Sequence, residues 1–431
     1  MAMKSFAKIL LISVALQMQQ AIPAQEAIGT SELVQANNAF AVELYSCLAK
    51  QPGNFVCSPF SIDTALTMAS AGARGTTARQ MAKVLYDSNT NADLHAEFGD
   101  FLDRLKGINT SDTQFLVANS LWVQRGYPFL KPFQELLHNN YQAGLMQIDL
   151  TGWPAEFNPT VAAAARKQIN DWAANQTGGK INEFLPRTLP AQNTRLILLD
   201  AVYFKGLWAA HFETRLTTNS VFQIRTRESV SVPTMHIRGD FPYYYDEDFQ
   251  ALQLPYVSNR LSMLILLPKK NDGLSELEES ITVPRIEHVS LTGDSQQKTI
   301  AVSRIEQVCQ LISMRTVDVS LPRFTETSEF NLEEPLKAMG MIDAFQEDNA
   351  DFSGITTGKP FFMEAAIHEA RLSVDEQGTE AAAVAGLSFA DDDKSSPPPA
   401  FVADHPFLYL VRDNVTGTIL FMGRVVDPSK K

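Results

Sequence analysis

Sequence motifs of catalysis are missing from this chain of 431 residues. It contains no Gly-x-Ser-x-Gly turn of the kind that presents a hydrolase nucleophile. Ser295 follows Gly293 and Asp294, but it lacks the glycine that comes after a trypsin-type nucleophile. The seven histidines form no His-Glu-x-x-His pair, and no glycine-rich loop for phosphates or dinucleotides opens a helix. We therefore expect that the protein is not an enzyme and that it needs neither a metal nor an organic cofactor.

Cysteine is scarce, with three residues in the whole chain, Cys47, Cys57 and Cys309. Cys47 and Cys57 stand in apolar surroundings, where a cysteine usually acts as a small buried hydrophobe. One disulfide between two of the cysteines is possible, but an odd count of three indicates neither a disulfide framework nor a zinc site.

An excess of basic residues is also missing, because the formal net charge is −13 at pH 7. Such a chain is a poor partner for nucleic acid or for an anionic membrane surface. Arg74, Arg79 and Lys83 are spread among neutral residues. We therefore expect no nucleic-acid partner and no membrane partner, and a heparin-type cofactor is not supported.

Long hydrophobic runs are absent as well. The apolar run at residues 9–16 is too short to span a bilayer, and no later stretch is long enough. Lys4 and Lys8 precede this run, and small residues follow it near Ala24. This order is typical of a signal peptide, here residues 1–24, and the alternative is a buried N-terminal helix. We expect the protein to be secreted and extracellular.

Three glycosylation sequons begin at Asn109, Asn175 and Asn414. They matter only if the chain is exported. Asn414 lies close to predicted strands, which makes it the least secure of the three sites.

What the sequence does contain is an unusual segment at residues 374–396. Gly378 can adopt backbone angles that other residues avoid, and residues 379–390 hold no proline and mostly small side chains. An acidic run with one lysine follows at residues 391–394. A strand here would place on one face Thr379, Ala381, Ala383, Ala385, Leu387 and Phe389. That face is small and uncharged enough to enter an existing sheet, although composition alone fits an alanine-rich helix or a linker equally well.

Several motifs, far apart in the chain, point in one direction. They are Asn54 with the run Ser58-Pro59-Phe60-Ser61; the run Phe204-Lys205-Gly206-Leu207-Trp208; the run Glu376-Gln377-Gly378-Thr379-Glu380-Ala381-Ala382-Ala383; and the C-terminal runs Asp404-His405-Pro406-Phe407 and Phe421-Met422-Gly423-Arg424-Val425. Together they resemble signature segments of the serpins, a family of serine protease inhibitors. The resemblance extends from about Asn37 to Pro428, nearly the whole chain.

The resemblance implies the serpin fold, of α+β class. It would be a single domain over residues 25–431, with three β-sheets, about eight or nine helices and an exposed reactive loop at about residues 375–400. Hydrophobic spacing agrees, since it predicts a helix at residues 37–48 and an apolar strand at residues 196–204. The polar residues 290–305 are expected to form an inserted surface loop, to which we assign no role.

The resemblance also implies which residues control the opening of the main sheet. They would be Asn54, Ser58, Ser61, Asp200, Trp208 and His368. On local sequence alone, Ser58 only needs to cap a helix that starts at Pro59, and His368 is expected to be structural. Asp200 stands where the family usually has asparagine. Because a buried acid is costly unless it is protonated or paired, this departure puts the fine control of the sheet in doubt.

The family resemblance implies a suicide-type inhibitor of a secreted serine protease. The protease cuts the loop and forms an acyl-enzyme. The freed segment then inserts into the sheet while the protease is still covalently attached, a transition already known for this family. The small hinge residues 379 and 381–383 favour inhibition over the alternative, a non-inhibitory serpin that serves as a carrier, chaperone or storage protein. We expect a monomer.

Two positions of the cleaved bond stay open. Counting from Gly378 at the spacing usual in the family ends near the Asp392–Asp393 bond, whereas the prolines after Ser396 point to the Lys394–Ser395 bond. We favour the second bond, because lysine suits the acidic specificity pocket of trypsin-like proteases. The aspartates before the lysine would favour an enzyme with a basic rim.

Overall fold

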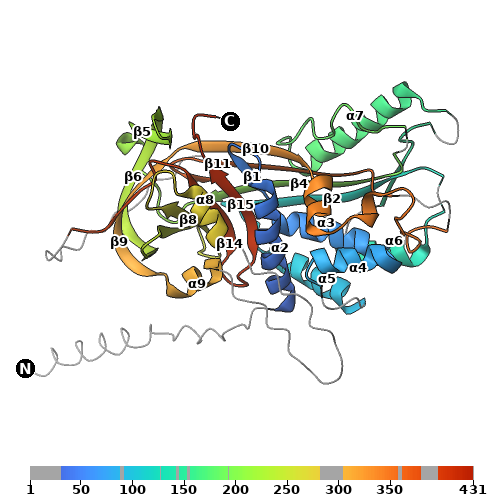
Figure 1. The fold of residues 1–431 in the computed structure, drawn as a ribbon, viewed down its shortest axis with the longest axis horizontal. Helices are drawn as coiled ribbons and strands as arrows, with labels where there is room; N and C mark the ends of the chain where they lie inside the picture. Colours follow the sequence, from blue (N-terminus) through green and yellow to red (C-terminus); the bar gives the residue numbers. More distant parts are fainter. Residues whose placement is uncertain are drawn as a thin grey trace, which may run out of the picture.

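The computed structural model describes residues 31–87, 92–126, 128–141, 145–152, 156–192, 194–281, 304–357, 362–379 and 397–430, and Figure 1 shows their arrangement. The predicted signal peptide lies outside these residues, as does nearly all of the predicted inserted loop. The hinge beyond Thr379 and both candidate cleavage sites also lie outside them.

A six-stranded sheet runs across the upper half of Figure 1. In spatial order its strands are β10 (Phe324–Asn331), β11 (Ala365–Val374), β12 (Gly378–Thr379), β4 (Leu196–Leu207), β2 (Thr113–Gln124) and β3 (Leu145–Ile148). β11 and β4 are parallel and pair directly, from Ala365 with Ile197 to Arg371 with Tyr203. Beyond this stretch β12 lies between them, antiparallel to both. We call the boundary between β4 and β11 the seam.

The other described strands form one nine-stranded sheet. They are β1 (Phe55–Cys57), β15 (Ile419–Val425), β14 (Phe407–Asp413), β8 (Leu261–Pro268), β7 (Phe249–Pro255), β6 (Glu228–Tyr245), β9 (Ser313–Pro322) and β13 (Ala400–Val402) in this order, with β5 (Thr218–Arg225) paired to β6. The long strand β6 pairs with β9 through residues 234–243 and with β7 through residues 243–245. Because β6 runs through both groups of strands, the described residues form two hydrogen-bonded sheets in place of the three expected.

Nine α-helices belong to the described residues. They are α2 (Glu32–Leu48), α3 (Pro59–Ser70), α4 (Gly75–Val84), α5 (Ala92–Lys106), α6 (Lys131–Tyr141), α7 (Pro159–Gln176), α8 (Leu274–Ser280), α9 (Arg304–Leu311) and α10 (Glu333–Met339), with short 3-10 turns η1 (Thr214–Leu216) and η2 (Asp343–Phe345). Local sequence explains the start of α3, because Ser58 Oγ accepts a hydrogen bond from Ser61 N and Pro59 follows the cap. Within this part of the chain no helix has the length and apolar character needed to cross a membrane.

The six-stranded sheet separates two layers of the molecule. α7 covers one face, and α3 lies against the other (Figure 1). Ile169 of α7 belongs to a small apolar cluster with Ile197 and Leu199 of β4 and Ile367 of β11. Leu198, between the two β4 residues, belongs instead to the main core. Since side chains alternate along a strand, the odd-numbered residues of β4 face α7 and the even-numbered residues face α3.

The three cysteines all lie in described segments, and no disulfide joins Cys47, Cys57 and Cys309. Cys57 is fully buried in β1, as expected for a small hydrophobe. Cys47 of α2 is only half-buried.

Candidate functional site

The top of the seam is where the chain leaves β11 and turns back. The segment that follows β4 holds this turn through backbone carbonyls. Trp208 N donates to Gln377 O at 2.8 Å, and Trp208 Nε1 donates to Asp375 O at 3.0 Å. Phe212 N donates to Glu376 O at 2.9 Å. Three consecutive carbonyls of the hinge are therefore fixed before the chain reaches β12.

Gly378 and Thr379 form β12 and already lie inside the sheet. Thr379 pairs with Val374 of β11 on one side and with Gly206 of β4 on the other. Gly378 has a φ of +156°, and a Cβ at this position would stand 2.0 Å from Gly206 O, so only glycine fits. The Thr379 side chain is fully buried, and its Oγ1 lies 2.9 Å from the hydroxyl of Tyr256. The hinge is therefore the formed start of a strand.

A charged clamp holds the hinge from the side. Glu376 Oε1 accepts hydrogen bonds from Arg323 Nε at 2.8 Å, from Arg323 Nη2 and from Thr217 Oγ1. The Glu376 side chain is 6% exposed, whereas that of Arg323 is 40% exposed. Burial by itself raises the pKa of Glu376, but the hydrogen bonds from Arg323 and Thr217 outweigh burial and lower the pKa below the ordinary carboxyl value. The clamp is thus an ion pair that reaches the surface on the arginine side.

An aromatic wall stands beside the hinge. The rings of Trp208 and Tyr256 stack with centroids 4.6 Å apart and an interplanar angle of 14°. Burial raises the pKa of Tyr256, so its hydroxyl stays neutral beside Thr379. The family resemblance pointed to Trp208 alone. Sequence reasoning missed Tyr256, Arg323 and Thr217, because none of them belongs to a recognisable motif.

A polar cluster lies halfway down the seam and consists of Ser58, Ser61, Asn119, Asp200 and His368. Ser61 Oγ donates to Asp200 Oδ1 at 2.5 Å, and Asn119 Nδ2 donates to Ser61 O at 3.1 Å. Ser58 N donates to His368 Nε2 at 3.1 Å, which makes Nε2 the unprotonated ring nitrogen. The proton of a neutral imidazole then sits on Nδ1, which faces Asp200 Oδ2 at 3.4 Å. Four of the residues singled out from the sequence thus meet here, and Asn119 joins them.

The contact between Asp200 and His368 crosses the seam. The two residues are direct partners in the parallel register of β4 and β11. Their side chains are 2% and 0% exposed. Within the described part of the chain, neither Asp200 Oδ2 nor His368 Nδ1 has a hydrogen-bond partner. This is an uncommon state for buried polar atoms, and it leaves the pair only half satisfied.

Other groups around the cluster are neutral. The ring of Phe330 in β10 stacks on His368 with centroids 6.4 Å apart. Burial raises the pKa of the Cys57 thiol, and the nearby charge of Asp200 adds to this effect. The thiol therefore stays protonated.

Asn54 lies apart from this cluster, against the C-terminal segment. Its Nδ2 donates to Glu326 Oε1 and to Asp427 O, both at 2.7 Å. Its Oδ1 accepts from Val426 N at 2.6 Å and from Asp427 N at 2.8 Å. Burial raises the pKa of Glu326 to about 8. Asn54 therefore joins the end of the chain to β10, which borders β11.

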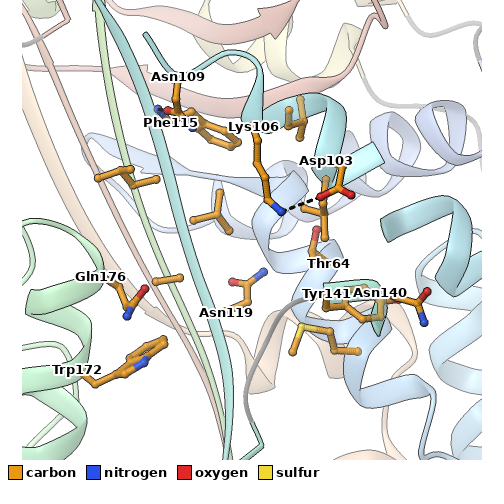
Figure 2. Close-up of a pocket in the computed structure, with 16 residues that line it drawn as sticks. Thr64, Asp103, Lys106, Asn109, Phe115, Asn119, Asn140, Tyr141, Trp172 and Gln176 are labelled. Atoms are coloured by element: carbon orange, nitrogen blue, oxygen red, sulfur yellow. Dashed lines mark hydrogen bonds and ion pairs between the residues drawn. The ribbon is translucent and has the colours of Figure 1, made fainter. Parts of the chain in front are cut away.

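A cavity of about 400 Å³ lies beside β2. Figure 2 shows that Asn119 of β2, Tyr141 of α6 and Trp172 of α7 stand around this space. Thr64 of α3 lines it as well. Because Asn119 also belongs to the polar cluster, the cavity adjoins the β4 side of the seam, and β2 is not tightly packed against the helices there.

The three sequons differ in their surroundings. Asn109 and Asn175 are exposed, whereas Asn414 is half-buried. Asn414 Nδ2 donates to Asn259 O at 2.9 Å, and its Oδ1 accepts from Ser262 Oγ at 2.8 Å. A glycan on Asn414 would have to replace the bond to Asn259.

The sequence of the chain matches a known protein family. Residues 35–428 match the family model described as serpin (serine protease inhibitor). The chain therefore belongs to the serpin family, whose members are protease inhibitors and not enzymes. A serine protease is the target class that the family implies.

Individual relatives agree with this assignment. The chain is 36% identical over 398 residues to an uncharacterized serpin-like protein of Thermococcus kodakarensis, with 92% of this chain and 86% of the relative covered. It is 34% identical over 405 residues to the leukocyte elastase inhibitor of Bos taurus, with 92% and 100% covered. Its structure is similar to that of Serpin48 from the insect Tenebrio molitor, with a TM-score of 0.77, 27% identity and coverage of 93% and 99%. The serpin fold expected from the sequence is confirmed.

Proposed function

We propose that this serpin traps a serine protease by inserting its cleaved loop as a new strand between β4 and β11. The observation that carries the proposal is β12. Thr379 already pairs with both walls of the seam, and Gly378 pairs with Leu207 of β4; β12 is antiparallel to each wall. The new strand would therefore extend from a start that is already hydrogen-bonded, with no separate nucleation.

The walls of the seam stand in the register that a further strand needs. Val374 and Gly206, the partners of Thr379, have the same relative register as Ala365 and Ile197, which pair directly lower in the seam. A strand continued from Thr379 would therefore meet both walls without sliding one wall along the other. The walls only have to separate by about one strand spacing, about 4.8 Å.

The loop sequence suits both faces of this slot. Thr379 faces the main core beside Tyr256. Alternation along a strand then directs to the same side Ala381, Ala383, Ala385, Leu387 and Phe389. On the opposite face, the register brings Gly386 level with Leu199, which packs in the cluster beneath α7. A residue without a side chain leaves room there for α7 to stay in place.

The free energy of insertion is large enough to distort an attached protease. About a dozen inserted residues at about 3.3 Å each make a strand about 40 Å long. Ladder hydrogen bonds at about 1 kcal/mol net each, with burial of the core-facing side chains, release on the order of 10 kcal/mol. A whole domain is stabilised by about the same amount. The intact state, in which β4 and β11 pair directly and the loop is not inserted, would persist only because a kinetic barrier separates it from the inserted state.

The polar cluster and the aromatic wall would set that barrier. We assign Ser58, Ser61, Asp200 and His368 to the control of sheet opening. Ser58 N binds His368 of β11, Ser61 Oγ binds Asp200 of β4, and Asp200 faces His368 across the two walls. Trp208 would act at the entry, where it holds the hinge carbonyls. Asn54 would act indirectly, by anchoring β10 beside β11.

The protease would be trypsin-like. Lys394 before Ser395 suits an acidic specificity pocket, and the acidic run before the lysine would attract an enzyme with a basic rim. The alternative bond, Asp392–Asp393, would require a different specificity. Attack by the catalytic serine gives an acyl-enzyme at the cut residue, and insertion would occur before that ester is hydrolysed.

Incubation with trypsin tests the proposal. A covalent adduct that survives denaturing electrophoresis is expected, and the mass of the released C-terminal fragment identifies the cut bond. Trypsin with a blocked catalytic serine is the matched control and should give no adduct. A chain that is only clipped, and that then melts no higher than the intact chain, would contradict inhibition and favour a carrier, chaperone or storage protein.

We also propose that the protein is secreted as a glycoprotein. Residues 1–24 supply the signal peptide, and Asn109 and Asn175 are exposed acceptors. Expression in a secretory eukaryotic host should release a chain that starts near residue 25 and loses mass on deglycosylation. Retention in the cells with the original N-terminus would contradict export.

A further inference from the structure

We propose that the edge of β2 that faces away from β4 binds a short extended peptide segment with a large aliphatic side chain. The segment would add to the six-stranded sheet as a further strand and fill the cavity beside β2. This site is separate from the seam, because β4 stands between the two. It goes beyond protease trapping and does not depend on loop insertion.

β2 is paired fully along one edge and only in part along the other. On the first edge, β4 pairs with residues 113–123. On the second edge, β3 pairs with residues 121–124 alone. Within the described part of the chain, residues 114–120 therefore have a neighbouring strand on one side only. Such an edge is a template for pairing with another chain.

Hydrogen bonds at both ends of β2 show which of its residues point toward the second edge. Asp112 O accepts from Leu207 N, on the side of β4. Arg125 N donates to Ile148 O, on the side of β3. Because successive residues of a strand direct their backbone groups to opposite sides, the odd-numbered residues of β2 face away from β4. Val117 N and Val117 O therefore face the second edge, and no described residue binds either of them.

Side-chain and turn hydrogen bonds close one end of this edge. Asn109 Oδ1 accepts from Phe115 N at 2.6 Å, and Thr110 N donates to Thr113 O at 2.7 Å. These bonds take the place of a neighbouring strand, and β3 fills that place again from residue 121. The stretch between them, residues 116–120, is called the open edge below. It has the length of one short strand, and Val117 lies within it.

The cavity of about 400 Å³ lies against the open edge. Its volume falls in the range of about 300–1,000 Å³ that is usual for ligand sites. Leu116, Val117 and Ala118 all line it, and since side chains alternate along a strand, the cavity reaches both faces of β2. Figure 2 shows Trp172 of α7 on one side of β2 and Tyr141 of α6 on the other. A strand added at Val117 would therefore enter the cavity.

The walls of the cavity select the side chains of the added strand. Directly opposite residues of two paired strands place their side chains on the same face. The residue opposite Val117 would therefore point to the wall formed by Met68, Leu102 and Leu105. This wall is aliphatic and suits a leucine. The residues before and after that leucine would point to the other face, where Trp172 stands.

Charge favours a segment without acidic residues. Asp103 and Lys106 line the cavity as an ion pair of 2.7 Å and add no net charge. Asn140 and Gln176, which line it as well, are neutral amides. The chain as a whole carries a net charge of −13, so it repels acidic segments and attracts basic ones. The expected occupant is a neutral or basic extended segment with leucine at its centre.

Peptide binding to the intact chain tests the proposal. The probe is acetyl-Lys-Thr-Leu-Thr-Lys-amide, and its matched control carries a methyl group on the leucine nitrogen. An antiparallel leucine opposite Val117 would donate to Val117 O and accept from Val117 N. The methyl group removes this donor and keeps the charge and the side chains. By isothermal titration calorimetry, the control should bind about tenfold more weakly or worse. Equal affinity would overturn strand addition, because burial of the leucine alone would explain it.

Hydrogen exchange shows where the probe binds. With the probe at about ten times its Kd, amides of residues 116–118 should exchange roughly tenfold more slowly. β5 is the matched control edge, because among the described strands it pairs with β6 alone, and its exchange should not change. Slower exchange at β5 in place of β2, or no change at either strand, would overturn the proposal.

A pair of variants tests the aliphatic wall. Leu102→Lys places a cation in the wall opposite the bound leucine, and it should weaken the probe about tenfold or more. Leu94→Lys, on the same helix and also half-buried but away from the cavity, should keep the affinity within about twofold. Unchanged affinity in Leu102→Lys would contradict the site. The peptide comparison uses the natural protein, so it decides the question even where a variant folds poorly. None of these measurements cuts the loop, so a failure of protease trapping would leave them unaffected.

Discussion

The top and the middle of the seam are opposites in how they satisfy their polar groups. At the top, Thr379 pairs with both walls, its hydroxyl meets Tyr256, and Glu376 holds three hydrogen bonds. In the middle, the contact of Asp200 with His368 leaves one buried atom of each without a hydrogen bond in the described residues. The entry is therefore already formed by hydrogen bonds, whereas lower in the seam β4 and β11 still pair directly with each other.

The largest effect should come from a charge at the entry. Thr379→Arg puts a cation where the side chain is fully buried against Tyr256, and a buried unpaired charge costs several kcal/mol. Clipping should then no longer raise Tm, and trypsin should cleave the loop without forming an adduct.

Glu380→Arg is the matched control for that variant. The alternate residue of the new strand faces away from the main core, level with Lys205 at the edge of the slot. This variant should keep most of the adduct. Equal loss of adduct in both variants would show that insertion does not depend on which side of the sheet the substituted residue faces.

The next largest effect is a pH dependence of stability that comes from Glu326, which lies outside both the top and the middle of the seam. Burial raises the pKa of Glu326 to about 8, above the ordinary value of about 4.3 for the unfolded chain. Between these values the folded state binds more protons, so the free energy of unfolding falls as pH rises toward 8 and changes little above it. Glu326→Gln keeps an acceptor for Asn54. It should remove roughly 2–4 kcal/mol of the fall in the free energy of unfolding over this pH range.

Urea unfolding of intact and clipped protein from acidic to alkaline pH measures that slope. Both forms should lose it equally in Glu326→Gln, because Glu326 lies outside the seam. If Glu326→Gln removes the pH dependence of the free energy of unfolding only from the clipped form, Glu326 takes part in insertion. It could then no longer be treated as lying outside the seam.

A smaller effect is expected from the donor in the middle of the seam. Ser61→Ala removes the hydroxyl that donates to Asp200 Oδ1 and leaves both carboxylate oxygens poorly satisfied, which should cost the intact chain about 1–3 kcal/mol. Ser70→Ala, on the same helix, removes a hydroxyl that donates to Thr67 O and should cost less. The two variants are compared by urea unfolding, and equal losses would remove the special role of the cluster.

The smallest effect should arise at the entry. Tyr256→Phe removes the partner of Thr379 Oγ1 and keeps the stack on Trp208, so the intact chain should lose about 0.5–1.5 kcal/mol. Tyr245→Phe, at an exposed ring, should change little. A Tyr256→Phe chain as stable as the natural one would mean that Thr379 is not held in the sheet in solution.

Sequence reasoning could predict the parts of this site that depend on local chemistry. Gly378 was recognised as a pivot, and Ser58 as a cap, from the residues around them. The resemblance supplied the fold, and hydrophobic spacing predicted a helix at residues 37–48, although α2 begins earlier at Glu32. Its start depends on the Ser31 cap, which precedes the apolar pattern.

The remaining features depend on pairings between distant parts of the chain. Arg323 reaches Glu376 because β10 borders β11, and no local pattern announces that ion pair. The resemblance grouped Asn54 with Ser58 and Ser61, yet the Asn54 side chain turns to the C-terminal segment. The resemblance implied three sheets, whereas in the described residues β6 pairs with both β7 and β9 and so joins two groups of strands into one hydrogen-bonded sheet.

The position of β13 decides what happens to the second piece of a cut loop. Residues 400–402 pair in parallel with β9, and β14 and β15 continue from there into the centre of the nine-stranded sheet. Severing the loop upstream therefore yields two polypeptides that stay locked in one particle. The smaller one would separate only under denaturing conditions, so gel filtration should not distinguish the nicked protein from the intact one.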